Sequence, residues 1–227
     1  IPPTNWTGVT SFTYYVGDGS LVSNTATVTI NVNESNQAPT DITLINNSLA
    51  ENEPIGTMIG QFNTLDPDVP LDSFEYMLVA GDGDDDNLSF SIIGDTLISN
   101  LIFDYESKYT YTIRVRSTDQ GNETVESSFT IYITDANDPP AAYDKSVQTL
   151  EDKPLNISIE GFDEDVGDEL SYVLVQDTSN GELPWTPPDL TYTPDPGFVG
   201  TDTFDYRVID EQNASSNIAS VTVPKLP

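Results

Sequence analysis

Apolar and polar residues alternate one by one in several stretches of this 227-residue chain. The alternation is regular over residues 26–32, 109–116 and 129–134, where the apolar positions are mostly β-branched or aromatic. A period of two is typical of a β-strand that buries one of its faces. No stretch shows a convincing helical period. The pattern therefore predicts an all-β protein built from half-buried strands.

Short segments rich in glycine and asparagine separate these stretches. They include Gly17-Asp18-Gly19, Gly81-Asp82-Gly83, Gly121-Asn122 and Asn180-Gly181, which are residue types that favour tight turns. A β-sandwich module of this kind takes about 100 residues, so the length predicts two or three modules. We expect Greek-key β-sandwiches arranged in a linear tandem array.

The beginning of the chain repeats its end. Residues 2–18 match residues 194–210 at a constant offset of 192 positions, and after one inserted residue the match resumes over 24–30. The repeat predicts an incomplete C-terminal half of a module at 1–35, a complete module at 36–138 and another at 139–227. A 35-residue half module buries too little apolar surface to fold alone. Its missing half either belongs to the parent protein, which we favour, or comes from another chain in a homophilic, strand-completing contact.

Charge narrows the functions that the chain can have. Its 38 acidic and 7 basic residues give a formal net charge of −31. This charge excludes nucleic acid as a partner and disfavours anionic membrane surfaces, and no apolar run approaches the about 20 residues that insertion into a membrane requires. The chain has neither cysteine nor histidine, which excludes disulfides, thiolate zinc sites and histidine-based catalytic triads. The acidity indicates a solubilising surface, a set of oxygen ligands for a hard cation such as Ca²⁺, or both.

Six acidic motifs in residues 36–140 occur in the order of a cadherin repeat of the bacterial type. They are Ala38-Pro39-Thr40-Asp41-Ile42, Glu51-Asn52-Glu53-Pro54, Asp66-Pro67-Asp68, Phe103-Asp104-Tyr105-Glu106, the strand ending at Asp119, and Asp135-Ala136-Asn137-Asp138. The middle module therefore resembles such a repeat, with Tyr105 in place of the family's arginine. The flanking modules resemble the cadherin-like or Ig-like repeats of large bacterial surface adhesins, on Leu150-Glu151-Asp152, Phe162-Asp163-Glu164-Asp165 and Phe204-Asp205-Tyr206.

The resemblance implies Ca²⁺ ligands that converge where modules meet. At the second junction the implied ligands are Glu51, Asp104, Glu106, Asp135, Asn137, Asp138, Asp163, Asp165 and Asp210. Asp104 and Glu106 are two residues apart in a segment expected to be extended, so their side chains would point the same way. At the first junction the implied ligands are Asp66, Asp68 and Asp119, with Asn33 and Glu34 from the linker. The acids of the preceding half module are lacking there, so we expect one ion or none.

The resemblance also implies a function. We expect a calcium-rigidified extracellular spacer or adhesion segment of a cell-surface adhesin or filament, with neighbouring repeats of the same protein as its partners. The alternative is a carbohydrate-binding module for a polysaccharide, which would need exposed aromatic side chains such as Trp6 or Trp185. An enzyme is disfavoured, because the acids follow ligand positions at module ends rather than forming a pair across a cleft. For the acidic loop Asp82–Asp86, which lacks the later glutamate of an EF-hand, we favour a solvated surface.

Overall fold

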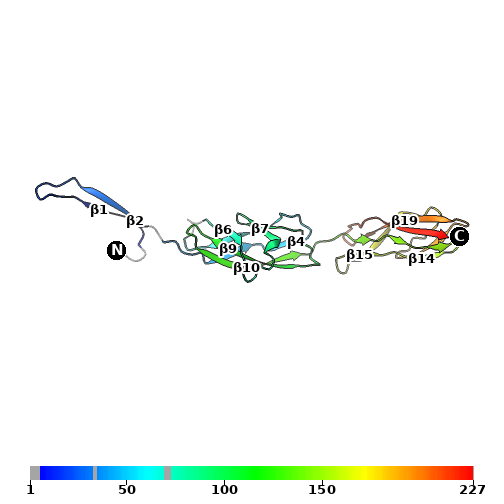
Figure 1. Ribbon diagram of the computed structural model, residues 1–227. Coiled ribbons are helices and arrows are strands. Elements are labelled where there is room, and N and C mark those ends of the chain that lie inside the picture. The colour runs from blue at the N-terminus through cyan, green and yellow to red at the C-terminus, as the bar shows by residue number, and fades with distance from the viewer. Residues whose placement is uncertain (1–5, 33–34, 69–72, 227) are drawn as a thin grey trace. The chain divides into compact units, whose positions relative to one another are not determined.

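The computed structural model describes residues 6–32, 35–68 and 73–226 (Figure 1). In this part of the chain the regular structure is β-strand throughout, apart from one turn of 3-10 helix at Asn87–Ser89. The all-β prediction is therefore confirmed. The chain divides into two compact units. The first comprises Ile1–Leu49, Glu53–Ile102 and Thr110–Tyr132, and the second comprises Ala50–Asn52, Phe103–Tyr109 and Ile133–Pro227.

The N-terminal strands β1 (Gly8–Tyr14) and β2 (Ala26–Val32) form an antiparallel hairpin (Figure 1). The strands occur where the alternation predicts them. The expectation that they are half-buried is wrong for several apolar side chains, since Phe12 is 54% exposed and Ile30 is 42% exposed. The physical reason is that the described residues provide no further strand for this sheet, which contains β1 and β2 alone.

Two four-stranded sheets form what we call the middle sandwich. One sheet has the order β3 (Asp41–Ile45), β5 (Met58–Leu65), β8 (Thr96–Ser99), β7 (Phe90–Ile93). The other has the order β4 (Ser48–Ala50), β10 (Thr124–Thr134), β9 (Thr110–Thr118), β6 (Glu75–Leu78). Tyr111, Ile113 and Val115 of β9 are buried, as their alternation predicts.

The C-terminal sandwich lies in the second unit. Its main sheet has the order β12 (Lys145–Ser146), β20 (Ala219–Leu226), β19 (Gly200–Ile209), β16 (Ser171–Gln176), and β13 (Thr149–Leu150) also pairs with β20. The smaller sheets are β14 (Leu155–Ser158), β18 (Asp189–Pro194), β17 (Gly181–Glu182) and the pair β11 (Ala141–Ala142), β15 (Gly161–Phe162).

The core of the C-terminal sandwich is apolar and lies beside the buried acid Asp202. Phe204, Val208 and Val221 are fully buried in it. Asp202 is 3% exposed, and its carboxylate accepts hydrogen bonds from the Tyr192 hydroxyl (2.9 Å) and from the backbone N–H groups of Ser179 and Asn180. Burial alone would raise the pKa of Asp202, but these hydrogen bonds favour the charged form and the pKa is lowered overall. The acid is thus a structural part of the core.

Candidate metal centre

Glu51 organises an acidic site inside the second unit. Its side chain is 2% exposed. One carboxylate oxygen accepts the N–H of Tyr105 (2.6 Å) and the other accepts the N–H of Ala136 (2.9 Å). A buried carboxylate requires such partners, so Glu51 fixes the positions of two acid-bearing segments that lie about 30 residues apart in sequence.

The segment that carries Asp104 and Glu106 is a turn. The Lys108 N–H donates to the Asp104 carbonyl (3.0 Å), and the Ser107 N–H donates to the Asp104 carboxylate (2.7 Å). The expectation of an extended segment is therefore wrong. The physical reason is that an aspartate side chain can accept a nearby backbone N–H and so favours a turn. Both carboxylates still reach one place, because oxygens of Asp104, Glu106 and Glu164 lie within 4.8 Å of one another.

A second acidic turn lies at 163–168. The Asp165 N–H donates to the Asp163 carboxylate (3.2 Å), and the Asp168 N–H is 3.4 Å from the Asp165 carbonyl. Gly167 has φ +109°, a conformation that L side chains rarely adopt. The turn brings Asp168 back toward Asp163, and oxygens of Asp163, Asp168 and Asp210 lie within 4.8 Å of one another.

The segment 135–138 joins these turns through hydrogen bonds. The Asp138 N–H donates to Asp165 Oδ2 (2.9 Å), and Asn137 Nδ2 donates to Asp210 Oδ2 (3.0 Å). Asn52, in the left-handed region at φ 62°, donates from Nδ2 to Asp138 Oδ1 (2.9 Å). All nine residues predicted for the second junction thus lie in one compact unit.

We define the second acidic cluster as the carboxylates that gather in this place. Its members are Glu51, Asp104, Glu106, Asp135, Asp138, Asp163, Glu164, Asp165, Asp168 and Asp210. Two further groups within 4.8 Å combine Glu106 with Glu51 and Asp135, and with Asp138 and Asp165. Ca²⁺ binds oxygens at about 2.3–2.6 Å, so its opposite ligands are about 5 Å apart. The spacing fits Ca²⁺, and Glu106 belongs to three of the four groups that would hold it.

The electrostatics of the second acidic cluster favour a cation. Burial raises the pKa of Glu106, and the negative charges of Glu51, Asp135 and Asp165 raise it further. The pKa of Asp138 is also raised, by burial first and then by the charges of Glu51, Asp165 and Asp104.

Three oxygens in the cluster are buried without a hydrogen-bond donor: Asp163 Oδ2, Asp165 Oδ1 and Asp168 Oδ2. Burial also raises the pKa of Asp168, as do the charges of Asp163 and Asp165. A buried charged oxygen without a partner is strongly unfavourable in free energy. Asp163 and Asp168 belong to one of the four groups and Asp165 to another, so divalent cations held by these two groups would give the oxygens partners, and the residues fit bound Ca²⁺.

Three residues of the site were not predicted from the sequence: Asp168, Glu164 and Asn52. For Asp168 a signal was present, since Gly167 directly precedes it and permits the turn that reverses the chain. Glu164 lies between two predicted ligands, where strict alternation would point it away. The bend at Glu164 and Asp165 removes that alternation, which is why Glu164 can approach Asp104.

The first acidic cluster consists of Asp66, Asp68 and Asp119, all in the first unit. Asp66 and Asp119 are each 5% exposed. Asp68 accepts the Gln37 N–H (2.6 Å), and Asp119 accepts Asn36 Nδ2 (2.9 Å). Asn33 and Glu34, also predicted as ligands, lie outside the described residues. Among the residues that the structure describes, no group of three acidic oxygens within 4.8 Å includes a member of this cluster.

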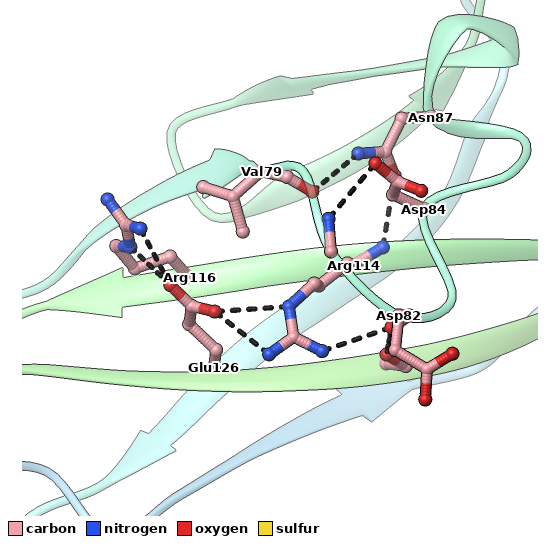
Figure 2. A network of polar contacts seen from close by, with 9 residues as sticks. Val79, Asp82, Asp84, Asn87, Arg114, Arg116 and Glu126 are labelled. Atoms are coloured by element: carbon pink, nitrogen blue, oxygen red, sulfur yellow. Dashed lines mark hydrogen bonds and ion pairs between the residues drawn. The ribbon is translucent and has the colours of Figure 1, made fainter.

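The loop Asp82–Asp86 uses its acids to hold its own conformation (Figure 2). The Asp84 carboxylate accepts the Gly81 N–H (3.1 Å), and Asp86 accepts the Thr112 N–H (2.8 Å). Arg114 donates to the Asp82 carbonyl (3.0 Å) and pairs with Glu126 at 2.9 Å (Figure 2). These contacts attach the loop to β9 and leave the Asp84 and Asp86 carboxylates engaged with backbone donors, unlike the orphaned oxygens of the second acidic cluster.

The chain is similar in sequence and fold to cadherin-like and Ig-like domains. A family model described as a bacterial Ig domain matches residues 137–224. Protocadherin gamma-A6 of Homo sapiens is 28% identical over 181 residues, which cover 72% of this chain and 19% of that protein. Protein dachsous of Drosophila melanogaster is 28% identical over 137 residues, which cover 57% of this chain and 4% of that protein. The chain thus spans about a fifth or less of these relatives' length.

Solved structures show the same fold. The human protocadherin-24 EC1-2 structure matches with a TM-score of 0.59 at 14% identity, covering 84% of this chain and 100% of that one. The protocadherin GammaB4 extracellular domain matches with a TM-score of 0.51 at 20% identity, covering 96% of this chain and 38% of that one. No helix in the described part of the chain is long and apolar enough to cross a membrane. The findings together show an all-β chain with a cadherin-like and Ig-like fold.

Proposed function

We propose that this chain is a calcium-dependent spacer or adhesion segment of an extracellular surface protein. The repeat boundaries 36–138 and 139–227, the bacterial adhesin context and the neighbouring repeats as partners are parts of this proposal. Its similarity in fold to a protocadherin extracellular domain supports the extracellular location. The proposed role of the chain is mechanical. Without Ca²⁺ the acidic segments of the second acidic cluster repel one another, and with Ca²⁺ they are held together.

One observation carries the proposal: three buried carboxylate oxygens, on Asp163, Asp165 and Asp168, have no hydrogen-bond donor. Like charges about 4 Å apart repel by roughly 1–4 kcal/mol, depending on the local dielectric. Glu106, Asp135 and Asp138 add further negative charge to the same place. Bound Ca²⁺ would supply positive charge and take six to eight oxygens. The chain's own residues supply the carboxylates and, through Glu51 and Asn137, hold the backbone segments that carry them.

The carbohydrate-binding alternative has weaker support. Trp185 packs against the core with its ring edge-on to Phe204 at 6.4 Å between centroids, and its Nε1 donates to the Tyr172 carbonyl (3.3 Å). A sugar-stacking platform needs an open aromatic face, whereas Trp185 packs against the core of the C-terminal sandwich.

The test is thermal unfolding of the full chain in EDTA and in 10 mM Ca²⁺, an addition of roughly 10 to 100 times the dissociation constant usual for extracellular modules. Mass action then predicts a stabilisation of about 1.4–2.7 kcal/mol for each ion bound. Asp104→Ala is expected to remove most of this gain. Asp85→Ala, which changes an exposed acid in the 82–86 loop, is the matched control and should keep it.

The proposal fails if calcium leaves the melting temperature of the natural chain unchanged. It also fails if Asp85→Ala reduces the calcium response as much as Asp104→Ala does, because the response would then reflect total charge rather than a site. Isothermal titration calorimetry on the same proteins supplies the number of ions.

A further inference from the structure

The hairpin β1–β2 exposes an apolar face. Phe12, Tyr14 and Val16 are 54%, 48% and 65% exposed. In the hairpin register, Phe12 is paired with Val28 and Tyr14 with Ala26. Apolar side chains from both strands therefore lie side by side on a surface that the described residues do not cover.

The C-terminal sandwich contains the equivalent hairpin, β19–β20, inside a complete set of strands. In β19–β20, Phe204 is paired with Val221 and Tyr206 with Ala219. The two registers coincide residue by residue along the internal repeat.

The connections of the two hairpins also agree in their hydrogen bonds. Ser23 Oγ accepts the Val16 N–H (3.0 Å) as Ser216 Oγ accepts the Val208 N–H (2.8 Å). Both serines donate to the carbonyl of the next residue. The two hairpins are therefore equivalent in local structure, and the exposure of β1–β2 cannot be attributed to a different conformation.

The two hairpins differ in the exposure of their apolar side chains. Phe204, Tyr206 and Val208, the equivalents of Phe12, Tyr14 and Val16, are 0%, 1% and 0% exposed. In the C-terminal sandwich β16 extends the sheet beyond β19, β12 and β13 run parallel to β20, and residues of β14 and β18 belong to the same core. The covering strands all come from residues 141–194, which precede β19.

Two polar side chains identify the same covering segment. The Tyr206 hydroxyl lies 2.9 Å from the carbonyl oxygens of Tyr143 and Glu160. The Asn217 side chain accepts the Ala142 N–H and donates to the Ala142 carbonyl, both at 3.0 Å. The equivalents in the first hairpin are Tyr14 and Asn24, and neither side chain has a hydrogen-bond partner among the residues that the structure describes. The side chains of Tyr14 and Asn24 are therefore available to form hydrogen bonds with the backbone of a covering segment.

We propose that the apolar face of β1–β2 is a docking surface for the N-terminal strands of an Ig-like module, a segment of the same kind as residues 139–199. The segment belongs to the same polypeptide, because in the C-terminal sandwich the covering residues lead directly into β19 along the chain. Its backbone passes Asn24 and Tyr14 as Ala142, Tyr143 and Glu160 pass Asn217 and Tyr206. The docked segment completes a sandwich, and this inference is independent of whether Ca²⁺ binds at the second acidic cluster.

The experiment uses the chain's own C-terminal sandwich as the donor. Residues 139–197 are fused before Trp6, the equivalent of Phe198 at the repeat offset, so that the full chain from Trp6 onward follows the graft. Amide hydrogen exchange in 8–14 and 26–32 is expected to slow by about 100-fold or more relative to the ungrafted chain, since exchange then requires the new sandwich to open. The measurement is made in EDTA, so its outcome does not depend on calcium.

Variants of the graft test the contacts. Phe12→Asp should abolish the protection, whereas Thr13→Asp should keep it, because the equivalent of Thr13 is already an aspartate, Asp205. Asn24→Ala should lower the melting temperature of the grafted chain and leave that of the ungrafted chain unchanged. Unprotected hairpin amides in the grafted chain, or equal loss in Phe12→Asp and Thr13→Asp, would overturn the proposal.

The source of the segment is tested on the ungrafted chain by sedimentation. A monomer with rapidly exchanging hairpin amides is the expected result. A dimer in which those amides are protected would instead assign the surface to a second copy of the chain and overturn the same-polypeptide source.

Discussion

The first and second acidic clusters contain the same arrangement of an Asp-x-Asp turn and a later aspartate, but they differ in the other acids that lie nearby. In each, the second aspartate of an Asp-x-Asp turn donates its N–H to the first, at 2.7 Å for Asp68 and Asp66 and at 3.2 Å for Asp165 and Asp163. In each, a preceding asparagine side chain donates to the aspartate that follows a later strand, Asp119 or Asp210. The same short-range hydrogen bonds therefore build both half-sites.

The second acidic cluster adds what the first lacks. Glu51, Asp104 and Glu106 lie within the same unit as the half-site, and Asp168 follows the turn. In the first acidic cluster one buried oxygen, Asp66 Oδ2, has no donor, whereas the second has three such oxygens. Local turns therefore prepare a half-site, and the number of carboxylates that distant segments add determines how strongly the site requires a cation.

The largest expected effect comes from removing the acid that organises the second acidic cluster. Glu51→Ala leaves the N–H groups of Tyr105 and Ala136 without their acceptor, and each unsatisfied buried donor costs about 1–3 kcal/mol. We expect the free energy of unfolding of the second unit to fall by about 2–4 kcal/mol even in EDTA, and the calcium response to disappear. Glu53→Ala, two residues away and exposed, is the control for urea unfolding followed by Trp185 fluorescence. Equal effects of the two changes would contradict the assigned role of Glu51.

An intermediate effect is expected from Asp168→Asn, which makes the second acidic cluster more like the first. The amide keeps the size of the side chain but removes one negative ligand and its repulsion. We expect calcium affinity to fall by about tenfold, which corresponds to about 1.4 kcal/mol, while stability in EDTA stays the same or rises. Calorimetric titration measures the affinity, with Glu169→Gln as the exposed neighbouring control. Unchanged affinity would show that Asp168 is not a ligand.

The smallest effect is the response of the two clusters to pH without calcium. The pKa values of Glu106, Asp138 and Asp168 are raised above 4.5, 3.8 and 3.8. For these groups the folded state holds protons more tightly than the unfolded state, so stability is lost as pH rises through the folded pKa. Lowering the pH from 7 toward 4.5 in EDTA should therefore stabilise the second unit.

The first acidic cluster should respond in the opposite direction. Burial alone would raise the pKa of Asp119, but hydrogen bonds from Asn36 and from backbone N–H groups lower it below 3.8 overall. Its contribution to stability is present above 3.8 and is lost as pH falls through the lowered pKa. Hydrogen exchange of β9 amides, for the first unit, and of β19 amides, for the second, separates the two responses. A parallel response of both units would show that total charge, rather than the local contacts, governs them.

Much of the fold could be predicted from the sequence, because strand periodicity is local. The alternation of Tyr111, Ile113 and Val115 gives the buried face of β9 directly. The membership of the second acidic cluster was largely predicted too, through the order of its motifs. What alternation could not give was the conformation between strands: hydrogen bonds within residues 104–108 and 163–168 turn the chain, which changes the direction of Asp104 and brings in Glu164 and Asp168.

Long-range contacts account for the remaining differences. Asn52 approaches Asp138 across 86 positions in the chain, and no periodicity in sequence reports such a pair. The burial of β1–β2 was mispredicted for a related reason: alternation indicates which face of a strand is apolar, and only the neighbouring segments decide whether that face is covered.

The parallel pairing of β12 and β13 with β20 has a consequence for the response to force. β12 and β13 lie near the start of the C-terminal sandwich and β20 ends it. Bonds such as Val147 N–H to the Thr222 carbonyl (3.0 Å) and Glu151 N–H to the Leu226 carbonyl (3.0 Å) connect them. When the two ends of this sandwich are pulled apart, parallel strands slide along each other, so the load falls on these bonds together in shear. An antiparallel hairpin pulled at its two ends would open one bond at a time. The pairs β12–β20 and β13–β20 are therefore where this sandwich resists tension along the chain.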